Sequence, residues 1–285
     1  MVSLSDLTTP NVCNWCPGCG DFGIWAAFKN ACVQEGWDNF NTCMVAGIGC
    51  HGHIVNFLKL SSFEGLHGRP LPVASGIKLA NHRLNVVVFT GDGDCLAEGG
   101  NHFIHAARRN HDITVILHDN AVYGLTTGQT SPASPEGYKS KSTPGGNPDP
   151  EVNPAALAIA SGATFVARGY AGDIPCLTEL MVRAVRHKGF SLVDVLQPCV
   201  TFNKLYTHEF FRANTYKLPE GFDVTNKFAA FEKAHEWGEK KIPLGVLYEV
   251  DLPTQESKFP QLSEKPLVEQ TVEKRDLGEL MKGYM

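Results

Sequence analysis

The sequence lacks any apolar run that approaches the roughly 18 to 20 residues needed to span a bilayer. Its first residues, MVSLSDLTTPN, also lack the basic start and the apolar stretch of a secretion signal. Basic side chains are not in excess, because 25 Lys and Arg stand against 30 Asp and Glu. A nucleic-acid polyanion is therefore not expected as the main partner. These absences predict a cytoplasmic protein that engages no membrane and no nucleic acid.

Cysteine, by contrast, is abundant, with nine residues in 285. In the absence of a secretion signal, disulfides are a poor explanation for that number. Metal or cluster ligation is the better interpretation for cysteines that group by spacing. The remainder are expected to be small buried hydrophobic residues.

Short apolar runs rich in β-branched residues alternate with helix-like stretches along the chain. The expected strands cover residues 42–46, 86–90, 113–117, 164–167 and 192–196. One expected helix begins at Asp21, which is a candidate N-cap, and others cover residues 98–109, 154–161 and 174–187. This alternation predicts an α/β fold with a mainly parallel sheet that has helices on both faces.

Two segments interrupt the alternation. Residues 127–153 are dense in Pro, Gly and Ser, and a loop of that length is usually a lid or a partner-binding segment. Beyond about residue 201, apolar residues are scattered and no alternation is clear. We therefore expect one α/β domain over residues 1–203. Residues 204–285 are expected to form a C-terminal arm or tail that packs on the core or on a partner.

The residues that can carry chemistry fall just past the ends of the expected strands. Residues 47–50 (GIGC) follow the first strand, 91–94 (GDGD) the second, 119–120 (DN) the third and 198–199 (PC) the fifth. Open parallel sheets bind their ligands at the carboxyl ends of the strands. The sequence therefore predicts a single site at this edge of the sheet.

Asp92 and Asn120 are candidates to hold a magnesium ion beside a diphosphate. Glycines next to an acid let the backbone approach a diphosphate closely. Mg²⁺ prefers about six oxygen ligands, and Asp92 offers a carboxylate, Asn120 an amide oxygen and Val122 a backbone carbonyl. Either motif alone can equally be a tight turn or a helix cap. The pair is more specific, because one helix and one strand between the two residues bring them to adjacent strand ends.

Four cysteines suit a metal centre at the same edge. Cys16 and Cys19 form a C-x2-C pair before a helix, and Cys50 and Cys199 lie in loops at the expected cofactor edge. Four thiolates suit either a [4Fe–4S] cluster or structural zinc. Zinc sites usually draw on two such pairs, and Cys50 adjoins the expected diphosphate, which favours the cluster. Cys13 also stands three residues before Cys16, so three cysteines compete for two places.

Together these motifs make the chain resemble the β subunit of the two-subunit 2-oxoacid:ferredoxin oxidoreductases, whose fold binds thiamine diphosphate. The resemblance rests on residues 15–20 (WCPGCG), 47–53 (GIGCHGH), 67–81 (HGRPLPVASGIKLAN), 91–94 (GDGD), 109–123 (RNHDITVILHDNAVY), 124–132 (GLTTGQTSP) and 198–203 (PCVTFN). The thiamine-diphosphate motif, GDG followed some 25 residues later by an Asn pair, reads Asp119-Asn120 at its second part. The match covers residues 13–203 and thins beyond them.

The resemblance implies which residues hold each group. The [4Fe–4S] ligands would be Cys16, Cys19, Cys50 and Cys199, which leaves Cys13 a bystander, and the Mg²⁺ ligands would be Asp92, Asn120 and the carbonyl of Val122. Thiamine diphosphate would contact Ile48, Gly49, Cys50, His51, His67, Gly68, Gly91, Gly93, Asp94, Gly124 and Leu125. His51 and His53 are the candidate catalytic residues. The position of His53 faces the substrate carboxylate in related enzymes, some of which carry Lys or Arg there.

The resemblance also implies the reaction and the partners. The expected reaction is a coenzyme-A-dependent oxidative decarboxylation of a 2-oxoacid, or its reverse, with electrons passing through the cluster to ferredoxin. The GIGCHGH motif favours 2-oxoglutarate, with pyruvate and branched-chain 2-oxoacids as alternatives. An α subunit is the expected partner, in an αβ dimer or an (αβ)2 assembly, because in this family it supplies the carboxylate that activates thiamine.

Three other interpretations use parts of the same pattern. Residues 47–52 match the G-x-G-x-x-G dinucleotide fingerprint, but no acid follows at the usual spacing of about 20 residues. A nicotinamide dehydrogenase would also leave the cysteines unexplained. A non-redox thiamine-dependent decarboxylase would keep the GDG motif and Asn120 without a cluster. A zinc-stabilised binding module would use the cysteines without any catalysis.

Overall fold

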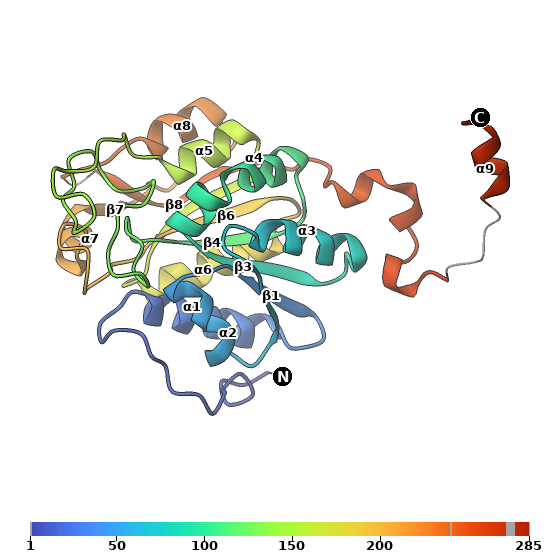
Figure 1. Cartoon of the computed structure of the whole chain (residues 1–285), viewed down its shortest axis with the longest axis horizontal. Coiled ribbons are helices and arrows are strands. Elements are labelled where there is room, and N and C mark those ends of the chain that lie inside the picture. The colour runs from blue at the N-terminus through green and yellow to red at the C-terminus, as the bar shows by residue number, and fades with distance from the viewer. Residues whose placement is uncertain (1, 240, 272–276, 285) are drawn as a thin grey trace.

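An eight-stranded sheet forms the centre of the molecule, which was analysed as a computed structural model (Figure 1). The structure describes residues 2–239, 241–271 and 277–284. In spatial order the strands are β2 (Ser61–Glu64), β1 (Thr42–Ala46), β3 (Asn85–Gly91), β4 (Thr114–Asp119), β6 (Ser191–Leu196), β5 (Phe165–Tyr170), β8 (Ile242–Glu249) and β7 (Thr215–Lys217). Every pairing in this order is parallel except that between β5 and β8. The predicted mainly parallel sheet is confirmed.

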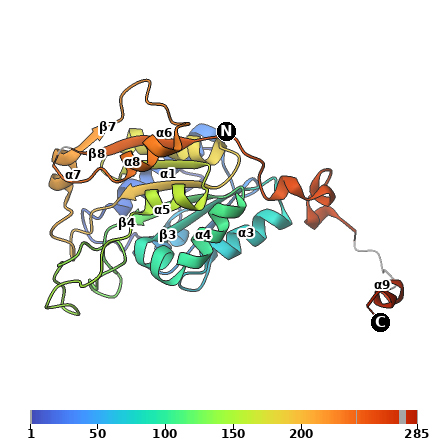
Figure 2. The ribbon, with the colours of Figure 1, turned by 90° about the horizontal axis from the view of Figure 1, so that it is seen from above.

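Helices cover both faces of the sheet, as the alternation predicted (Figure 2). One face carries α1 (Asp21–Glu35), α2 (Ile54–Phe57) and α6 (Ile174–Arg186), and the other carries α3 (Pro70–Ala80), α4 (Gly100–Arg109), α5 (Pro154–Ser161) and α8 (Lys227–Ala234). Successive residues of a strand point to opposite faces. Val87 and Phe89 of β3 accordingly join the core under α1 and α6, whereas Val86 and Val88 join the core under α3 and α4. None of the described helices is both long and apolar enough to cross a membrane.

The segment between β3 and α4 is longer than the sequence predicted, and it contains a wider type of helical turn. Residues Gly93–Glu98 form a π-helical turn, and α4 starts only at Gly100 rather than at residue 98. π-Helical turns are frequent at functional sites, because the extra residue redirects the side chains of the turn. Here the turn follows directly on Asp92, at the carboxyl end of β3.

From residue 204 to the end of β8 the chain contributes two further strands and two helices, and neither strand was predicted from the sequence. After α7 (His208–Asn214), β7 and α8, strand β8 pairs antiparallel with β5 across a bulge at Val166 and Ala167. Strand β8 contains Pro243 and Gly245, which are unusual inside strands and therefore hide the strand pattern in the sequence. The first part of residues 204–285 therefore packs on the core as strands of its sheet, and the projecting segment begins only after β8.

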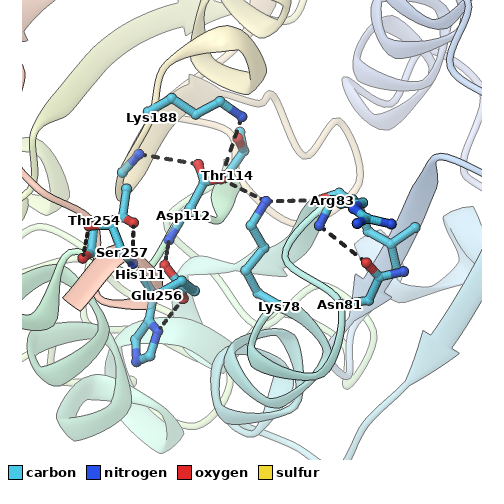
Figure 3. Close-up of polar contacts among 12 residues, drawn as sticks. Lys78, Asn81, Arg83, His111, Asp112, Thr114, Lys188, Thr254, Glu256 and Ser257 are labelled. Atoms are coloured by element: carbon cyan, nitrogen blue, oxygen red, sulfur yellow. Dashed lines mark hydrogen bonds and ion pairs between the residues drawn. The ribbon is translucent and has the colours of Figure 1, made fainter. Parts of the chain in front are cut away.

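Buried hydrogen bonds to Glu256 attach the projecting segment to the body, next to the Lys78–Asp112 ion pair (Figure 3). The imidazole Nδ1 of His111 lies 2.8 Å from Oε1 of Glu256, and the amide of Asp112 donates to Oε2 of the same carboxylate. The Asp112 carboxylate in turn lies 2.7 Å from the buried ammonium of Lys78. Beyond this anchor, the short turns Pro260–Leu262 and Leu267–Glu269 still lie against the body, where Oε1 of Glu269 is 2.7 Å from Nη1 of Arg83. Helix α9 (Gly278–Lys282) lies further out (Figure 1).

Acidification is expected to loosen this anchor. Burial alone would raise the pKa of Glu256, but hydrogen bonds from His111 and from backbone amides outweigh it and hold that pKa below the usual value of 4.5. A carboxyl group with a lowered folded-state pKa stabilises the fold above its unfolded pKa, and this contribution is lost as the pH falls through the folded value. Limited proteolysis within residues 250–271 should therefore accelerate below a pH of about 4.5. The Glu256→Gln variant should lose this pH dependence, whereas the exposed Glu264→Gln should keep it. Equal behaviour of the two variants would contradict the assignment.

Candidate active site

A pocket lies at the carboxyl ends of β1, β3 and β4, where the sequence predicted one site. Its walls are Ile48, Gly49, Cys50, His51, His67, Gly91, Asp92, Gly93, His118, Asn120, Val122, Tyr123, Gly124, Leu125, Thr126 and Gln197. All the residues predicted to contact thiamine diphosphate line this pocket except Gly68 and Asp94. The three predicted Mg²⁺ ligands line it as well. The structure therefore brings motifs that are distant in the sequence to one edge of the sheet.

Asp94 lies behind the pocket wall and holds three segments together. Its Oδ1 accepts hydrogen bonds from the amides of Ile48 (3.1 Å) and Gly68 (2.7 Å), and its Oδ2 accepts one from the hydroxyl of Thr90 (2.6 Å). The nearest ring nitrogen of His67 is 3.4 Å away. Both carboxylate oxygens are thus engaged within the chain, so the Asp94 side chain positions the loops that form the pocket.

The Asp94→Asn variant is expected to destabilise the pocket loops. An amide keeps one oxygen for Ile48 and Gly68, but its NH2 group cannot accept the hydroxyl of Thr90. A buried polar group without its partner costs about 1–3 kcal/mol. Thermal unfolding of the variant should show a loss of that size, with the exposed Asp149→Asn as the control. An unchanged unfolding temperature would contradict this positioning role.

The two candidate catalytic histidines occupy different environments. His51 is buried, and the amide of Gly91 donates to its Nε2 at 3.2 Å, which requires an unprotonated Nε2. Burial lowers the pKa of His51 to about 4, so its imidazole is neutral at neutral pH. His53 lies two residues further on the short helix Cys50–His53, outside the pocket lining, and its Nδ1 lies 2.9 Å from the side-chain oxygen of Asn14.

The predicted Mg²⁺ ligands lie on two adjacent strand ends. Asp92 is buried, and the hydroxyl of Ser131 from the long loop donates to its Oδ2. Burial raises the pKa of Asp92 to about 7, although the Ser131 hydrogen bond opposes this shift. Asn120 donates to Gln197 through its amide nitrogen, and its Oδ1 accepts from the amide of Val122. Between the two, Ala121 has a φ of 55°, a left-handed conformation that is rare for alanine and common at functional sites.

Gly93 lines the pocket, and its backbone packs against the ring of Tyr123. A Cβ atom at this position would lie 2.3 Å from that ring, which is closer than real contacts allow. A side chain here would displace Tyr123, so the present packing requires glycine. Glycine also lets a ligand approach the backbone of a turn closely, as a diphosphate and its metal ion require.

The four predicted cluster cysteines lie close together beside the pocket. An added Cβ on Gly124 would be 3.5 Å from the sulfur of Cys50 and 3.7 Å from that of Cys199, so these two sulfurs are neighbours. Burial raises the pKa of Cys50 to about 12, and Asp21, Cys199 and Cys16 add to the shift. Burial, Asp21 and Cys199 likewise raise the pKa of Cys19. Without a cation the thiols of Cys19 and Cys50 are therefore protonated, and a bound metal centre would have to stabilise their thiolates.

Hydrogen bonds fix the cysteine loops against one another. The amide of Gly20 donates to the carbonyl of Pro198 at 3.1 Å, and the side chain of Gln197 donates to the sulfur of Cys19 at 3.2 Å. The indole of Trp15 donates to the carbonyl of Cys50 at 2.7 Å. Within the described part of the chain, no three His, Cys, Asp or Glu side chains converge closely enough to hold a single metal ion.

Asp21 and His118 were not predicted as site residues. Both are buried, Nδ1 of His118 donates to Asp21 at 2.7 Å, and the thiol of Cys19 donates to the other Asp21 oxygen at 3.3 Å. The prediction of Asp21 as the N-cap of α1 was wrong, because the N-cap is Gly20. The sequence signal that could have identified His118 is its place directly after the apolar run VIL in strand TVILHD, where a buried residue is expected. The pair connects the cysteine loop with the pocket, which His118 lines.

Comparisons with known proteins agree with this geometry. Residues 47–195 match the thiamine pyrophosphate enzyme C-terminal TPP-binding domain, and residues 199–264 match the C-terminal region of the pyruvate ferredoxin oxidoreductase β subunit. A 2-oxoacid:ferredoxin oxidoreductase subunit β from Sulfolobus sp is 49% identical over 86% of this chain and 84% of its own. The 2-oxoglutarate synthase subunit KorB of Archaeoglobus fulgidus is 46% identical over 67% of this chain and 71% of its own.

Similarity extends to a solved structure. The 2-oxoglutarate:ferredoxin oxidoreductase of Magnetococcus marinus, described with 2-oxoglutarate, coenzyme A and succinyl-CoA bound, superimposes with a TM-score of 0.91. The two chains are 35% identical, and the match covers 100% of this chain and 96% of the other.

Proposed function

Because the chain belongs to the β subunits of the 2-oxoacid:ferredoxin oxidoreductases, we propose that it acts on 2-oxoglutarate. In this proposal the enzyme converts 2-oxoglutarate and coenzyme A to succinyl-CoA and CO₂, and ferredoxin receives the electrons. The reaction can also run in reverse as a carboxylation. The names of the KorB relatives and the ligands named for the Magnetococcus marinus enzyme support this substrate.

The observation that carries the proposal is the convergence on one sheet edge of the GDG turn, Asn120 and the cysteine loops. Asp92, Asn120 and the carbonyl of Val122 would hold Mg²⁺, and Gly93 would let the diphosphate approach the backbone of the turn closely. Thiamine diphosphate supplies an electron sink for the bond that breaks at the 2-oxo carbon. The chain itself orients this group: Asp94 fixes the loops, and neutral His51 lies buried against Gly91.

A [4Fe–4S] cluster is proposed at Cys16, Cys19, Cys50 and Cys199. The four cysteines influence one another electrostatically, and Cys50 also lines the proposed cofactor pocket. A redox group beside the cofactor accounts for that position, whereas a structural zinc ion does not. Burial raises the pKa of Cys13 and Lys29 opposes this shift, whereas other cysteines add to the raised pKa values of Cys19 and Cys50, which supports the role of Cys13 as a bystander.

We further propose that an α subunit completes the site in an αβ or (αβ)2 assembly, and that His53 faces the substrate carboxylate.

The direct test of the proposed function is to co-express the chain with its α subunit under anaerobic conditions. Viologen reduction should require coenzyme A and should be fastest with 2-oxoglutarate among 2-oxoglutarate, pyruvate and a branched-chain 2-oxoacid. A faster rate with another acid would replace the proposed substrate. Decarboxylation without dye reduction would instead favour a non-redox thiamine enzyme.

A further inference from the structure

A second and larger cavity, of about 460 Å³, lies on the other side of the strand end that presents Asn120. Residues 119–122 alternate between the two sites: Asp119 and Ala121 line the larger cavity, whereas Asn120 and Val122 line the pocket described above. Helices α5 and α8 and the end of the long loop form its other walls. The two cavities share no lining residue. We propose that this cavity is a binding site for a small aromatic cation, independent of the proposed thiamine chemistry.

The floor of the cavity carries a buried ion pair that the chain does not fully satisfy. Arg168 on β5 and Asp194 on β6 are partners in the sheet register, and their Nε and Oδ2 atoms are 3.0 Å apart. Both side chains are only 1% exposed. Nη1 of the arginine and Oδ1 of the aspartate nevertheless have no hydrogen-bond partner. Buried charged groups with unused hydrogen-bonding capacity are costly, and a polar ligand in the cavity would supply the missing partners.

The charge of the lining favours a cation over an anion. Three carboxyl groups, those of Asp119, Glu151 and Asp194, line the cavity together with one guanidinium, that of Arg168. His235 is the remaining basic group, and its Nδ1 lies 2.8 Å from the carbonyl of Phe231. The Arg168–Asp194 pair neutralises itself, and burial raises the pKa of Asp119 well above its usual value, so the exposed carboxylate of Glu151 remains as the charge that faces a ligand. A phosphate or carboxylate would be repelled, whereas an amidinium or ammonium group would be attracted.

Aromatic rings form the opposite wall. The rings of Tyr206 and Trp237 are 5.5 Å apart, and those of Tyr206 and Phe211 are 5.9 Å apart. Phe231 of α8 adds a fourth ring and is 41% exposed. Trp237 already accepts the guanidinium of Arg168 over its face, with 5.7 Å between the guanidinium carbon and the ring centroid. Aromatic walls combined with surplus carboxylates are the usual means of recognising organic cations.

The size of the cavity is adequate for a ligand of this kind. Small-molecule sites in proteins commonly enclose about 300–1,000 Å³, are mainly apolar and contain a few polar groups that fix orientation. The present cavity falls within this range. Its apolar aromatic wall faces a polar floor, which suits a flat apolar body with a charged end.

Benzamidine, an aromatic amidinium, is the probe for the test, and benzoate is its anionic counterpart. The co-expressed αβ complex would be titrated by calorimetry with thiamine diphosphate and Mg²⁺ in excess, so that the pocket beside Asn120 is filled. Benzamidine should bind saturably, and benzoate should not. Binding of both compounds with equal affinity, or of neither, would overturn the proposal.

Two phenylalanines of α8 provide a matched pair of variants for locating the ligand. Phe231 lines the cavity, whereas Phe228 is 87% exposed and does not. Phe231→Leu should weaken benzamidine binding roughly tenfold through the lost cation–π contact, and Phe228→Leu should leave it unchanged. The Trp237→Phe variant should remove the quenching of tryptophan fluorescence that benzamidine causes in the unaltered complex. Equal affinities of the two leucine variants, or quenching that persists in Trp237→Phe, would place the ligand elsewhere.

Discussion

Replacing Cys199 with serine is expected to abolish ferredoxin reduction and to bleach the visible absorption of the αβ complex. Cys199 is 8% exposed, and its sulfur neighbours that of Cys50 beside Gly124. A hydroxyl group is a far weaker ligand for iron than a thiolate, so the proposed [4Fe–4S] cluster should lose its fourth anchor. Iron and acid-labile sulfide should fall together with the visible band. The reduction rate should fall to the background of the assay, while binding of thiamine diphosphate persists.

The Cys13→Ser variant is the matched control for this prediction. Cys13 competes with Cys16 in the sequence spacing, but Cys16 rather than Cys13 is among the groups that raise the pKa of Cys50. Its replacement should leave the iron content and the dye reduction unchanged. A cluster lost in Cys13→Ser and kept in Cys16→Ser would reverse the assignment. Zinc in place of iron in the anaerobically purified complex would refute the cluster itself.

The Asp92→Ala variant is expected to lose Mg²⁺-dependent binding of thiamine diphosphate. Asp92 is the only carboxylate among the three proposed metal ligands, and its side chain is buried at the end of β3. Loss of a group that merely supports a metal ligand lowers affinity by about 10–100-fold, so loss of a ligand should exceed that range. Calorimetry on the assembled complex measures the change. The exposed Asp223→Ala is the control, and equal affinities for the two variants would place the metal elsewhere.

The same carboxyl group should make cofactor binding depend on pH. Burial raises the pKa of Asp92 from 3.8 to about 7 in the metal-free protein. A proton is then bound more tightly in the folded than in the unfolded state, so the stability of the apoprotein should fall as the pH rises from about 4 through about 7. Mg²⁺ competes with this proton. Its stabilising effect on the melting temperature should therefore be greater at pH 8 than at pH 6, and the Asp92→Asn variant should lose the difference.

Strand prediction succeeded where the chain is buried on both faces. The predicted bounds of β1 match the structure at both ends, and the bounds of the other predicted strands differ from the structure by at most three residues. A buried parallel strand appears in the sequence as a continuous apolar run, which few other structures imitate. Strand β2, with four exposed residues of sequence SSFE, gives no such signal, and β8 is interrupted by Pro243 and Gly245.

The composition of the active-site pocket was predictable for a related reason. Residues that directly follow parallel strands must meet at one edge, so Asp92 and Asn120 could be paired from their positions alone. The contact between Asp21 and His118 spans 97 positions and depends on how α1 docks against β4. The second cavity depends similarly on α8 and on residues near 237, which no local pattern relates to β5 and β6. Local periodicity contains no information about such packing.

The anchor at Glu256 places the projecting segment at the opposite end of the sheet from the proposed chemistry. Strand β4 runs from Thr114, next to the anchor residues His111 and Asp112, to Asp119 at the pocket edge. Its six residues span roughly 20 Å. Substrates and electron carriers would therefore approach the carboxyl end of β4, whereas a molecule attached to the segment would pull on the amino end of the same strand. An enzyme coupled to an electrode or a bead through residues beyond 263 would present its reactive edge to the solution.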